Sequence, residues 1–328
     1  MMKTDPIQPL TDRIQPENRG WEDVSVVTDQ LVIVRGGGDI ATGTIWALRR
    51  AGYPVLILES SHPSSIRRTV SLSEAVYEGS ASVEDLTVHL AGNLDEAQYL
   101  LFQDQIAIMA DPDGRAIREI IDSEEKYSEW DTGLTTLEGG GRHLFLTAVV
   151  DAILAKKNTG TTKDMAPFVI ALGPGFTAGV DCDVVIETMR GHRLARPVTE
   201  GSAAPDTGIP GMIAGHAADR VLHSPAEGVV HSIARIGDIV QEGQVICTVE
   251  PSRGGPSFEV RAPFTGLLRG MIRDGCQVTE NFKIADVDPR QSERENCYTI
   301  SDKARAIGGA VVQELTGFAA RAAVDETW

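Results

Sequence analysis

The sequence has little positive charge and no long apolar segment. Its 328 residues hold 30 Lys and Arg against 47 Asp and Glu, a formal net charge of −17. Nucleic-acid binders and proteins held on anionic lipid need a basic surface, so this balance excludes both classes. The longest apolar runs, such as 31–34 and 54–58, are far shorter than the roughly 20 residues of a membrane helix. The first residues also lack the apolar stretch of a signal peptide.

Cysteine, histidine and lysine are scarce as well. The four Cys show neither CxxC spacing nor disulfide density, which favours a reducing, cytoplasmic location. Asp181 and Asp183 flank Cys182 and are expected to raise the pKa of its thiol. The seven His form no HxH, HExxH or HxxxH pair, so we expect no metal site. Lys accounts for only 7 of the 30 cations and is absent from 164–282.

Composition and periodicity divide the chain into an α/β half and a β half. Residues 1–30 are polar and contain three Pro, which is typical of a flexible extension. Residues 31–195 alternate short β-branched runs with helical stretches, which predicts a Rossmann-like α/β domain with a parallel sheet. The strands expected after the first strand–helix–strand unit are 105–110, 149–154, 168–172 and 184–187. Residues 119–138 hold seven acids and one Lys and are interpreted as a solvated surface.

Helical periodicity disappears after about residue 195. Residues 223–250 repeat as 260–288, with Pro and Gly at matching positions. Two such copies can interlock because neither closes its own strand edges alone. We therefore expect a duplicated β barrel over 196–290 and a C-terminal helix within 291–328, with Ser301 as its N-cap. The apolar stripe of this helix comprises Ala304, Ile307, Val311, Leu315 and Phe318.

A glycine-rich loop follows the first expected strand and opens the first helix. It consists of Gly36, Gly37 and Gly38, with Ala41 one turn later. This spacing fits G-x-G-x-x-G/A, in which small residues let backbone N–H groups approach a pyrophosphate. Glu59 closes the next strand, where an acid would accept hydrogen bonds from a ribose hydroxyl. The pattern predicts a nucleotide site, with a tight turn that binds nothing as the alternative. Asp39 departs from it, since an anion beside phosphate is unfavourable.

Further candidates follow other expected strands, where open parallel sheets bind their ligands. Cations, amides and glycine backbone at such ends suit an anionic cofactor, and rigid turns or surface ion pairs are the alternative. The cofactor residues assigned on this ground are Arg68, Lys156, Asn158, Gly173, Gly175 and Arg190. The candidates for acid–base or nucleophilic chemistry are Lys157, Glu187, His192 and Cys297.

Seven ordered segments resemble the YqeB-type family of the selenium-dependent molybdenum hydroxylase system. They are VRGGGDIATG (34–43), RRTVSLSEAVYEG (67–79), AKKNTGT (155–161), ALGPGFTAGVDCDVVIETMRGH (171–192), TGIPG (207–211), KIADVDPR (283–290) and ISDKARAIGG (300–309). The resemblance implies an accessory or maturation factor. It makes the first domain similar to the dinucleotide-binding part of xanthine dehydrogenase accessory proteins. The β half is similar to the barrel-sandwich hybrid of biotinyl and lipoyl carriers.

The lysine count bears on that last similarity. Carrier domains attach their cofactor to a Lys on the hairpin between the half-repeats. Here the hairpin 250–257 contains Arg253 and no Lys, and a guanidinium does not replace an amine as acyl acceptor. We therefore expect neither biotin nor lipoate.

The leading hypothesis is an accessory factor that binds NAD or a dinucleotide form of the molybdenum cofactor. By resemblance, its partner is a molybdenum hydroxylase apoenzyme or the maturation machinery of that enzyme. One alternative is an NAD-dependent oxidoreductase that uses Lys157 or His192. Another is a non-catalytic docking protein whose acidic surface meets a basic partner. The sequence leaves open whether the chain forms a homo-oligomer.

Overall fold

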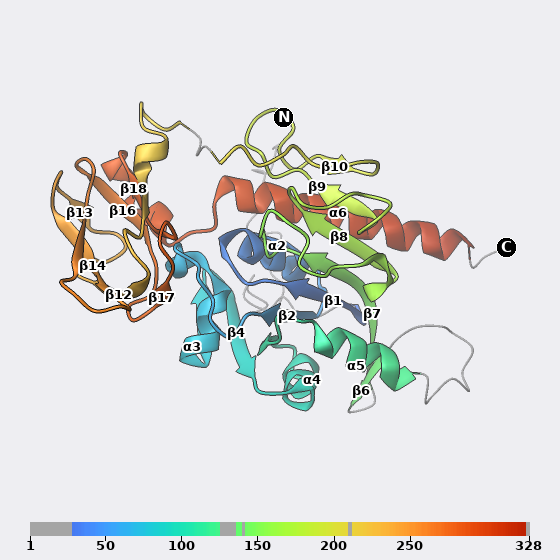
Figure 1. Ribbon diagram of the computed structural model, residues 1–328. Helices are drawn as coiled ribbons and strands as arrows, with labels where there is room; N and C mark the ends of the chain where they lie inside the picture. The colour runs from blue at the N-terminus through green and yellow to red at the C-terminus, as the bar shows by residue number, and fades with distance from the viewer. Residues whose placement is uncertain (1–27, 125–135, 140–141, 209–211, 326–328) are drawn as a thin grey trace, which may run out of the picture.

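The computed structural model describes residues 28–124, 136–139, 142–208 and 212–325, which form an α/β domain beside a smaller β domain (Figure 1). The strands of the first domain are β1 (Gln30–Arg35), β2 (Val55–Glu59), β3 (Ser80–Val83), β4 (Leu86–Ala91), β5 (Ile106–Ala110), β6 (Thr136–Gly139), β7 (Arg142–Asp151), β8 (Phe168–Leu172), β9 (Val184–Ile186) and β10 (Pro197–Val198). They form one sheet in the order β10-β9-β8-β7-β1-β2-β5-β4-β3, with β6 paired to β7. Neighbours from β9 to β4 run parallel, whereas β10, β6 and β3 are antiparallel to their partners.

Helices cover both faces of this sheet. The longer ones are α2 (Asp39–Arg50), α4 (Leu94–Phe102), α5 (Arg115–Glu124) and α6 (Asp302–Asp325), and α3 (Ala75–Glu78) is a single turn. Successive strand residues point to opposite faces. Val32 and Val34 therefore pack in a core with α2 and α6, and Leu31 and Ile33 pack in a second core with α4 and α5. The domain thus has three layers, with the parallel strands buried on both sides.

The C-terminal helix α6 returns to the α/β domain. The side chains expected on its apolar stripe from Ala304 to Leu315 are buried there, and the ring of Phe318 stacks on Phe168 with centroids 4.7 Å apart. The Ser301 hydroxyl accepts a hydrogen bond from the Ala304 N–H at 3.2 Å, which confirms the expected cap. A Cβ placed on Gly308 would lie 2.4 Å from the carbonyl oxygen of Gly43 in α2. Bare backbone is therefore required where α6 crosses α2.

The β domain consists of two four-stranded antiparallel sheets. Its strands are β11 (Val221–His223), β12 (Gly228–Ser232), β13 (Ile239–Val240), β14 (Val245–Pro251), β15 (Phe258–Arg261), β16 (Gly266–Met271), β17 (Gln277–Val278) and β18 (Lys283–Asp288). One sheet has the order β11-β18-β16-β13 and the other β15-β14-β12-β17. Each sheet takes two strands from β11–β14 and two from β15–β18. The two repeats of the sequence therefore exchange strands.

The two domains are joined by the segment that follows β2. The Met271 N–H donates to the carbonyl of Ile66 at 2.7 Å, and the Arg68 Nε donates to the carbonyl of Met271 at 2.9 Å. Arg273 of the β domain forms an ion pair with Glu74 at 3.0 Å and stands over the ring of Tyr77. Part of the RRTVSLSEAVYEG segment thus fixes the β domain on the sheet domain.

Several expectations about elements need correction or lie outside the described part. The strand expected at 149–154 is β7, which begins earlier and ends at Asp151. The antiparallel pair β3 and β4 was not expected. The expected extension 1–30 falls largely outside the described residues, as do residues 125–135 of the acidic stretch. No helix in the described ranges has the length and hydropathy for crossing a membrane.

Candidate functional site

The glycine-rich loop is held by hydrogen bonds within the protein. The N–H of Gly37 donates to Oε2 of Glu59 at 2.7 Å, and its carbonyl accepts from the N–H of Ser73 at 2.9 Å. The other carboxylate oxygen of Glu59 accepts from the N–H of Ser60, and burial raises the pKa of this acid. Gly38 is the most open, since a Cβ there would meet only the Ser65 hydroxyl at 3.4 Å. Glu59 therefore fixes the loop, and its role toward a ribose stays a prediction.

The acid that follows the glycines has a cationic partner. Asp39 lies 3.4 Å from the guanidinium of Arg67, which also donates to the carbonyl of Asn296. The positive charge of Arg67 offsets the negative charge of Asp39, which by itself would be unfavourable beside a phosphate. Arg68 points elsewhere, toward Met271 and Glu74 at the domain junction.

A buried ion pair fills the end of the sheet between β1 and β7. Arg35 and Asp151 close these two strands and lie 3.5 Å apart, each about 1 % exposed. The hydroxyl of Thr161 lies between them: it accepts from Arg35 and donates to Asp151. Asn158 accepts hydrogen bonds from the N–H groups of Gly160 and Thr161, both at 2.8 Å. Asn158 therefore shapes the loop after β7.

A cleft of about 650 Å³ opens between the two domains. Its walls come from the loops after β7, β8 and β9, the linker 204–208, the start of α6, and the β-domain strands β11 and β18. Four cations line it: Lys156, Arg190, Lys283 and Lys303. Asp206 is the only carboxylate among its described lining residues. Such a concentration of positive charge in a chain of net charge −17 suits an anionic ligand.

Lys156 and Lys303 both line this cleft and interact electrostatically with each other. Among the described residues neither makes an ion pair. Burial, followed by the neighbouring Lys156, lowers the pKa of Lys303, while Asp39 and Glu187 oppose the shift and Arg190 adds to it. Arg190 is already bound to Asp302 at 3.0 and 3.1 Å, and this contact lowers the pKa of Asp302 to about 2. The two lysines thus repel each other, and an anion bound there would relieve this repulsion.

Two glycines bring the loops of the cleft together. A Cβ on Gly173 would lie 2.5 Å from the hydroxyl of Thr188, and one on Gly175 would lie 2.6 Å from the Cα of Lys157. Both have positive φ, 79° and 109°, which L side chains rarely adopt. Glu187 holds the third loop, because its carboxylate accepts from the N–H groups of Met189 and Ala204. The predicted residues Lys156, Gly173, Gly175 and Arg190 therefore meet in one region.

Other predicted residues lie apart from the cleft. Lys157 and His192 are exposed and do not line it. Cys297, a candidate for nucleophilic chemistry, is the last residue of the 3-10 helix Gln291–Cys297 and is fully buried. Burial raises the pKa of its thiol, against the lowering by Arg67 and Arg269. This environment argues against a nucleophilic role. Burial, and then Asp181 and Asp183, raise the pKa of Cys182 to about 12, in the expected direction.

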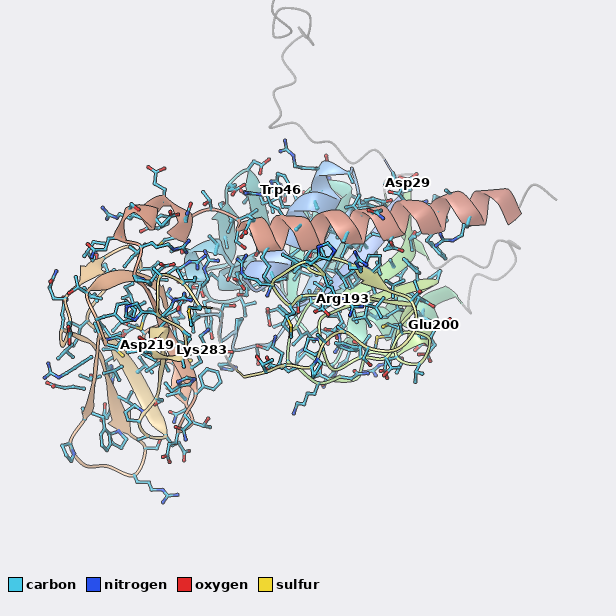
Figure 2. All side chains as sticks on the ribbon, turned by 90° about the horizontal axis from the view of Figure 1, so that it is seen from above. Asp29, Trp46, Arg193, Glu200, Asp219 and Lys283 are labelled. Carbon is cyan, nitrogen blue, oxygen red and sulfur yellow. The ribbon has the colours of Figure 1, made fainter. Side chains whose placement is uncertain are left out.

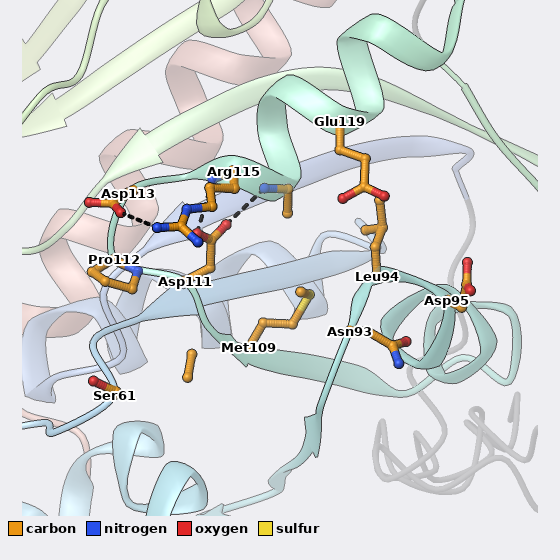
Figure 3. Close-up of a pocket in the computed structure, with 12 residues that line it drawn as sticks. Ser61, Asn93, Leu94, Asp95, Met109, Asp111, Pro112, Asp113, Arg115 and Glu119 are labelled. Carbon is orange, nitrogen blue, oxygen red and sulfur yellow. Dashed lines mark hydrogen bonds and ion pairs between the residues drawn. The ribbon is translucent and has the colours of Figure 1, made fainter.

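A second, smaller cavity of about 370 Å³ lies at the ends of β2, β4 and β5 (Figure 3). Its lining includes Asp111, Asp113 and Arg115. Both oxygens of Asp111 accept backbone N–H groups at the start of α5, from Arg115 at 3.0 Å and Ala116 at 2.8 Å. Arg115 in turn pairs with Asp113. These groups are used within the fold, so the cleft is the stronger candidate site.

Comparison with known proteins identifies a clear relative. No protein-family model matches the chain. Over 286 residues it is 43 % identical to the uncharacterized protein YqeB of Escherichia coli (strain K12), a match that covers 87 % of this chain and 47 % of that protein.

The matches among solved structures are weak. The product-bound ectoine utilization protein EutE (DoeB) from Ruegeria pomeroyi has 12 % identity and a TM-score of 0.23, covering 79 % of this chain and 85 % of that one. A succinylglutamate desuccinylase/aspartoacylase from Rhodobacter sphaeroides has 14 % identity and the same TM-score, covering 78 % and 86 %. Scores this low support no inference. The 43 % identity identifies the chain as a relative of YqeB over 286 residues, and it spans about half of that protein's length.

Proposed function

We propose that the chain binds a nucleotide or dinucleotide-type cofactor with its phosphate in the cleft, as an accessory protein of a molybdenum hydroxylase. The observation that carries the binding function is the juxtaposition of Lys156 and Lys303 in the cleft, where neither makes an ion pair with a described residue. Ammonium groups are common phosphate ligands in proteins. The accessory role comes from the resemblance of the seven segments.

The position of the cleft in the sheet supports a nucleotide ligand. Open parallel sheets bind ligands beyond the carboxyl ends of their strands, and the loops after β7, β8 and β9 form one wall of the cleft. The order β5-β2-β1-β7-β8-β9 matches the 3-2-1-4-5-6 order of a dinucleotide-binding sheet. We infer a Rossmann-like domain on this basis. The glycine loop is the alternative phosphate site.

The segments that carry the family resemblance also support the cleft. Five of the seven contribute a lining residue, namely 155–161, 171–192, 207–211, 283–290 and 300–309. These segments are distant in the sequence and meet only in the folded chain. A shared ligand site is a physical reason for them to occur together.

The oxidoreductase alternative receives less support. It needs a proton-transfer group near the substrate, and both Lys157 and His192 lie outside the cleft lining. The docking alternative relied on the acidic stretch 119–138, most of which lies outside the described residues. A binding function that needs no catalytic group fits the cleft better.

Calorimetry with ADP and NAD tests the binding function. We expect Lys156→Gln to weaken binding on the order of tenfold, because a charged hydrogen bond to phosphate is lost. Lys157→Gln is the matched control, since it removes the same charge from the exposed neighbour outside the lining. Equal effects of both substitutions would show that only overall charge matters. The absence of binding to the unaltered protein would contradict the proposal.

The accessory role needs a separate experiment. Native mass spectrometry of the freshly purified protein, alone and mixed with a molybdenum hydroxylase apoenzyme, should show a complex with that apoenzyme. A mixture in which the two proteins stay separate, with and without added nucleotide, would contradict the accessory role and leave the binding function standing.

A further inference from the structure

The β domain provides the far wall of the cleft. Lys283 is the first residue of β18 and His223 the last residue of β11, and the two are direct cross-strand partners. Both side chains are exposed and line the cleft. Figure 2 shows Lys283 on the side of the β domain that faces the α/β domain. In the described part of the chain, Lys283 makes no ion pair with a carboxylate.

The distance between the two walls is fixed by the domain junction. Arg68 and Ile66 bind the backbone of Met271 from the α/β side, and Arg273 pairs with Glu74 and Glu78. Met271 ends β16, which pairs with β18. The strand that carries Lys283 is thus tied to the segment that covers the glycine loop. The second cationic group therefore has a defined place relative to Lys156 and Lys303.

We propose that Lys283 and His223 form a second anion subsite, so that the ligand is a diphosphate held between the two domains. This inference rests on the proposed function and adds the class of ligand. Lys156, Lys283 and Lys303 supply three positive charges that form no ion pair with a described carboxylate, whereas Arg190 is bound to Asp302. A monophosphate ester carries about −1.5 to −2 charges at neutral pH, and a nucleoside diphosphate carries roughly one more. The diphosphate thus balances the three lysines better.

Calorimetry with ADP, AMP and inorganic pyrophosphate distinguishes the contributions of the two subsites to binding. We expect Lys283→Gln to weaken the binding of ADP and of pyrophosphate on the order of tenfold, and to change the affinity for AMP about twofold or less. Lys156→Gln should weaken the binding of all three ligands. Lys283→Arg keeps the charge and should restore most of the affinity. Arg253→Gln removes a charge from an exposed loop of the β domain outside the cleft and should change nothing.

The outcomes distinguish the two proposals. Two results would show that the second subsite is wrong: Lys283→Gln leaves ADP binding unchanged, or it weakens ADP binding and AMP binding equally. If Lys156→Gln still weakens the binding of both ligands, the binding function stands. If the unaltered protein binds none of the three ligands, both proposals fail. Hydrogen exchange adds an independent readout, because a bridging diphosphate should slow exchange at the amides of β11 and β18. Slowing confined to the loops after β7–β9 and to α6 would contradict bridging.

Discussion

The ammonium group of Lys303, at the start of α6, lies close enough to Lys156 to be destabilised by it, although the chain as a whole is strongly acidic. The two residues are 147 positions apart in the sequence. They are brought together because α6 packs on α2 after the chain has completed the β domain. Two lysines that repel each other in one cleft raise the free energy of the empty protein, and a bound phosphate would lower it.

Proton uptake on binding should report this repulsion. The pKa of Lys303 is lowered in the free protein, and a bound phosphate favours the charged ammonium and raises it again. The protein should therefore take up protons with ADP, and affinity should fall as pH rises through the lowered pKa. Calorimetry in buffers of different ionisation enthalpy, from about pH 7 up to the ordinary lysine pKa of about 10.4, measures this. Lys303→Arg should bind ADP without the uptake. Identical uptake in that variant would assign the proton to another group.

The crossing of α2 and α6 makes a sharp prediction for stability. Gly308→Ala places a Cβ 2.4 Å from the Gly43 carbonyl oxygen, so the helices must separate at a cost of about 1–3 kcal/mol. Gly309→Ala is the control, because a Cβ there meets nothing within 4 Å. It should stabilise the helix by up to about 1 kcal/mol. Urea unfolding of both variants provides the comparison. Equal stability would show that the crossing does not depend on bare backbone.

Glu59 should matter for the fold of the glycine loop. Glu59→Gln replaces one buried acceptor with an NH₂ group, leaving the N–H of Gly37 or Ser60 without a good partner. We expect the free energy of unfolding to fall by about 1–3 kcal/mol. Glu96→Gln is the control, since Glu96 also accepts a backbone N–H, from Gly92, but at an exposed site where water can replace it. If Glu59 serves only a ribose, the variant should instead lose discrimination between ADP and 2′-deoxy-ADP and keep its stability.

The ion pair at the end of β1 should also be required for stability. Arg35→Gln leaves Asp151 buried without its cationic partner, and breaking such a pair costs about 3–5 kcal/mol. The exposed pair of Arg115 with Asp113 provides the comparison, because surface ion pairs contribute little. Arg115→Gln should unfold at the same urea concentration as the unaltered protein. Similar losses for the two variants would mean that burial does not decide the contribution.

Much of the fold follows from local sequence patterns. The β-branched runs of β1 and β2, the apolar stripe of α6 and its Ser301 cap are local signals, and the structure contains all of them. The edge pair β3–β4 was missed although Ser80–Val83 alternates polar and apolar residues, because this strand has only four residues and is largely exposed. The start of β7 was missed because this strand begins with two polar residues, Arg142 and His143.

The candidate site was only partly predictable. Lys156, Gly173, Gly175 and Arg190 follow consecutive parallel strands, whose carboxyl ends lie at one edge of the sheet. Lys283 and Lys303 were not assigned, because one belongs to the β domain and the other to the returning helix. Both lie in segments that carry the family resemblance. Because the chain has only seven Lys, the presence of a Lys in each of these two segments was the signal that could have identified them.

A crystal structure of the protein with bound ADP tests the proposed phosphate site most directly. We predict the phosphates between the domains, within hydrogen-bond distance of the Nζ atoms of Lys156 and Lys303. Phosphates seated on Gly36–Gly38 at the start of α2, or in the cavity beside Asp111, would contradict the central claim.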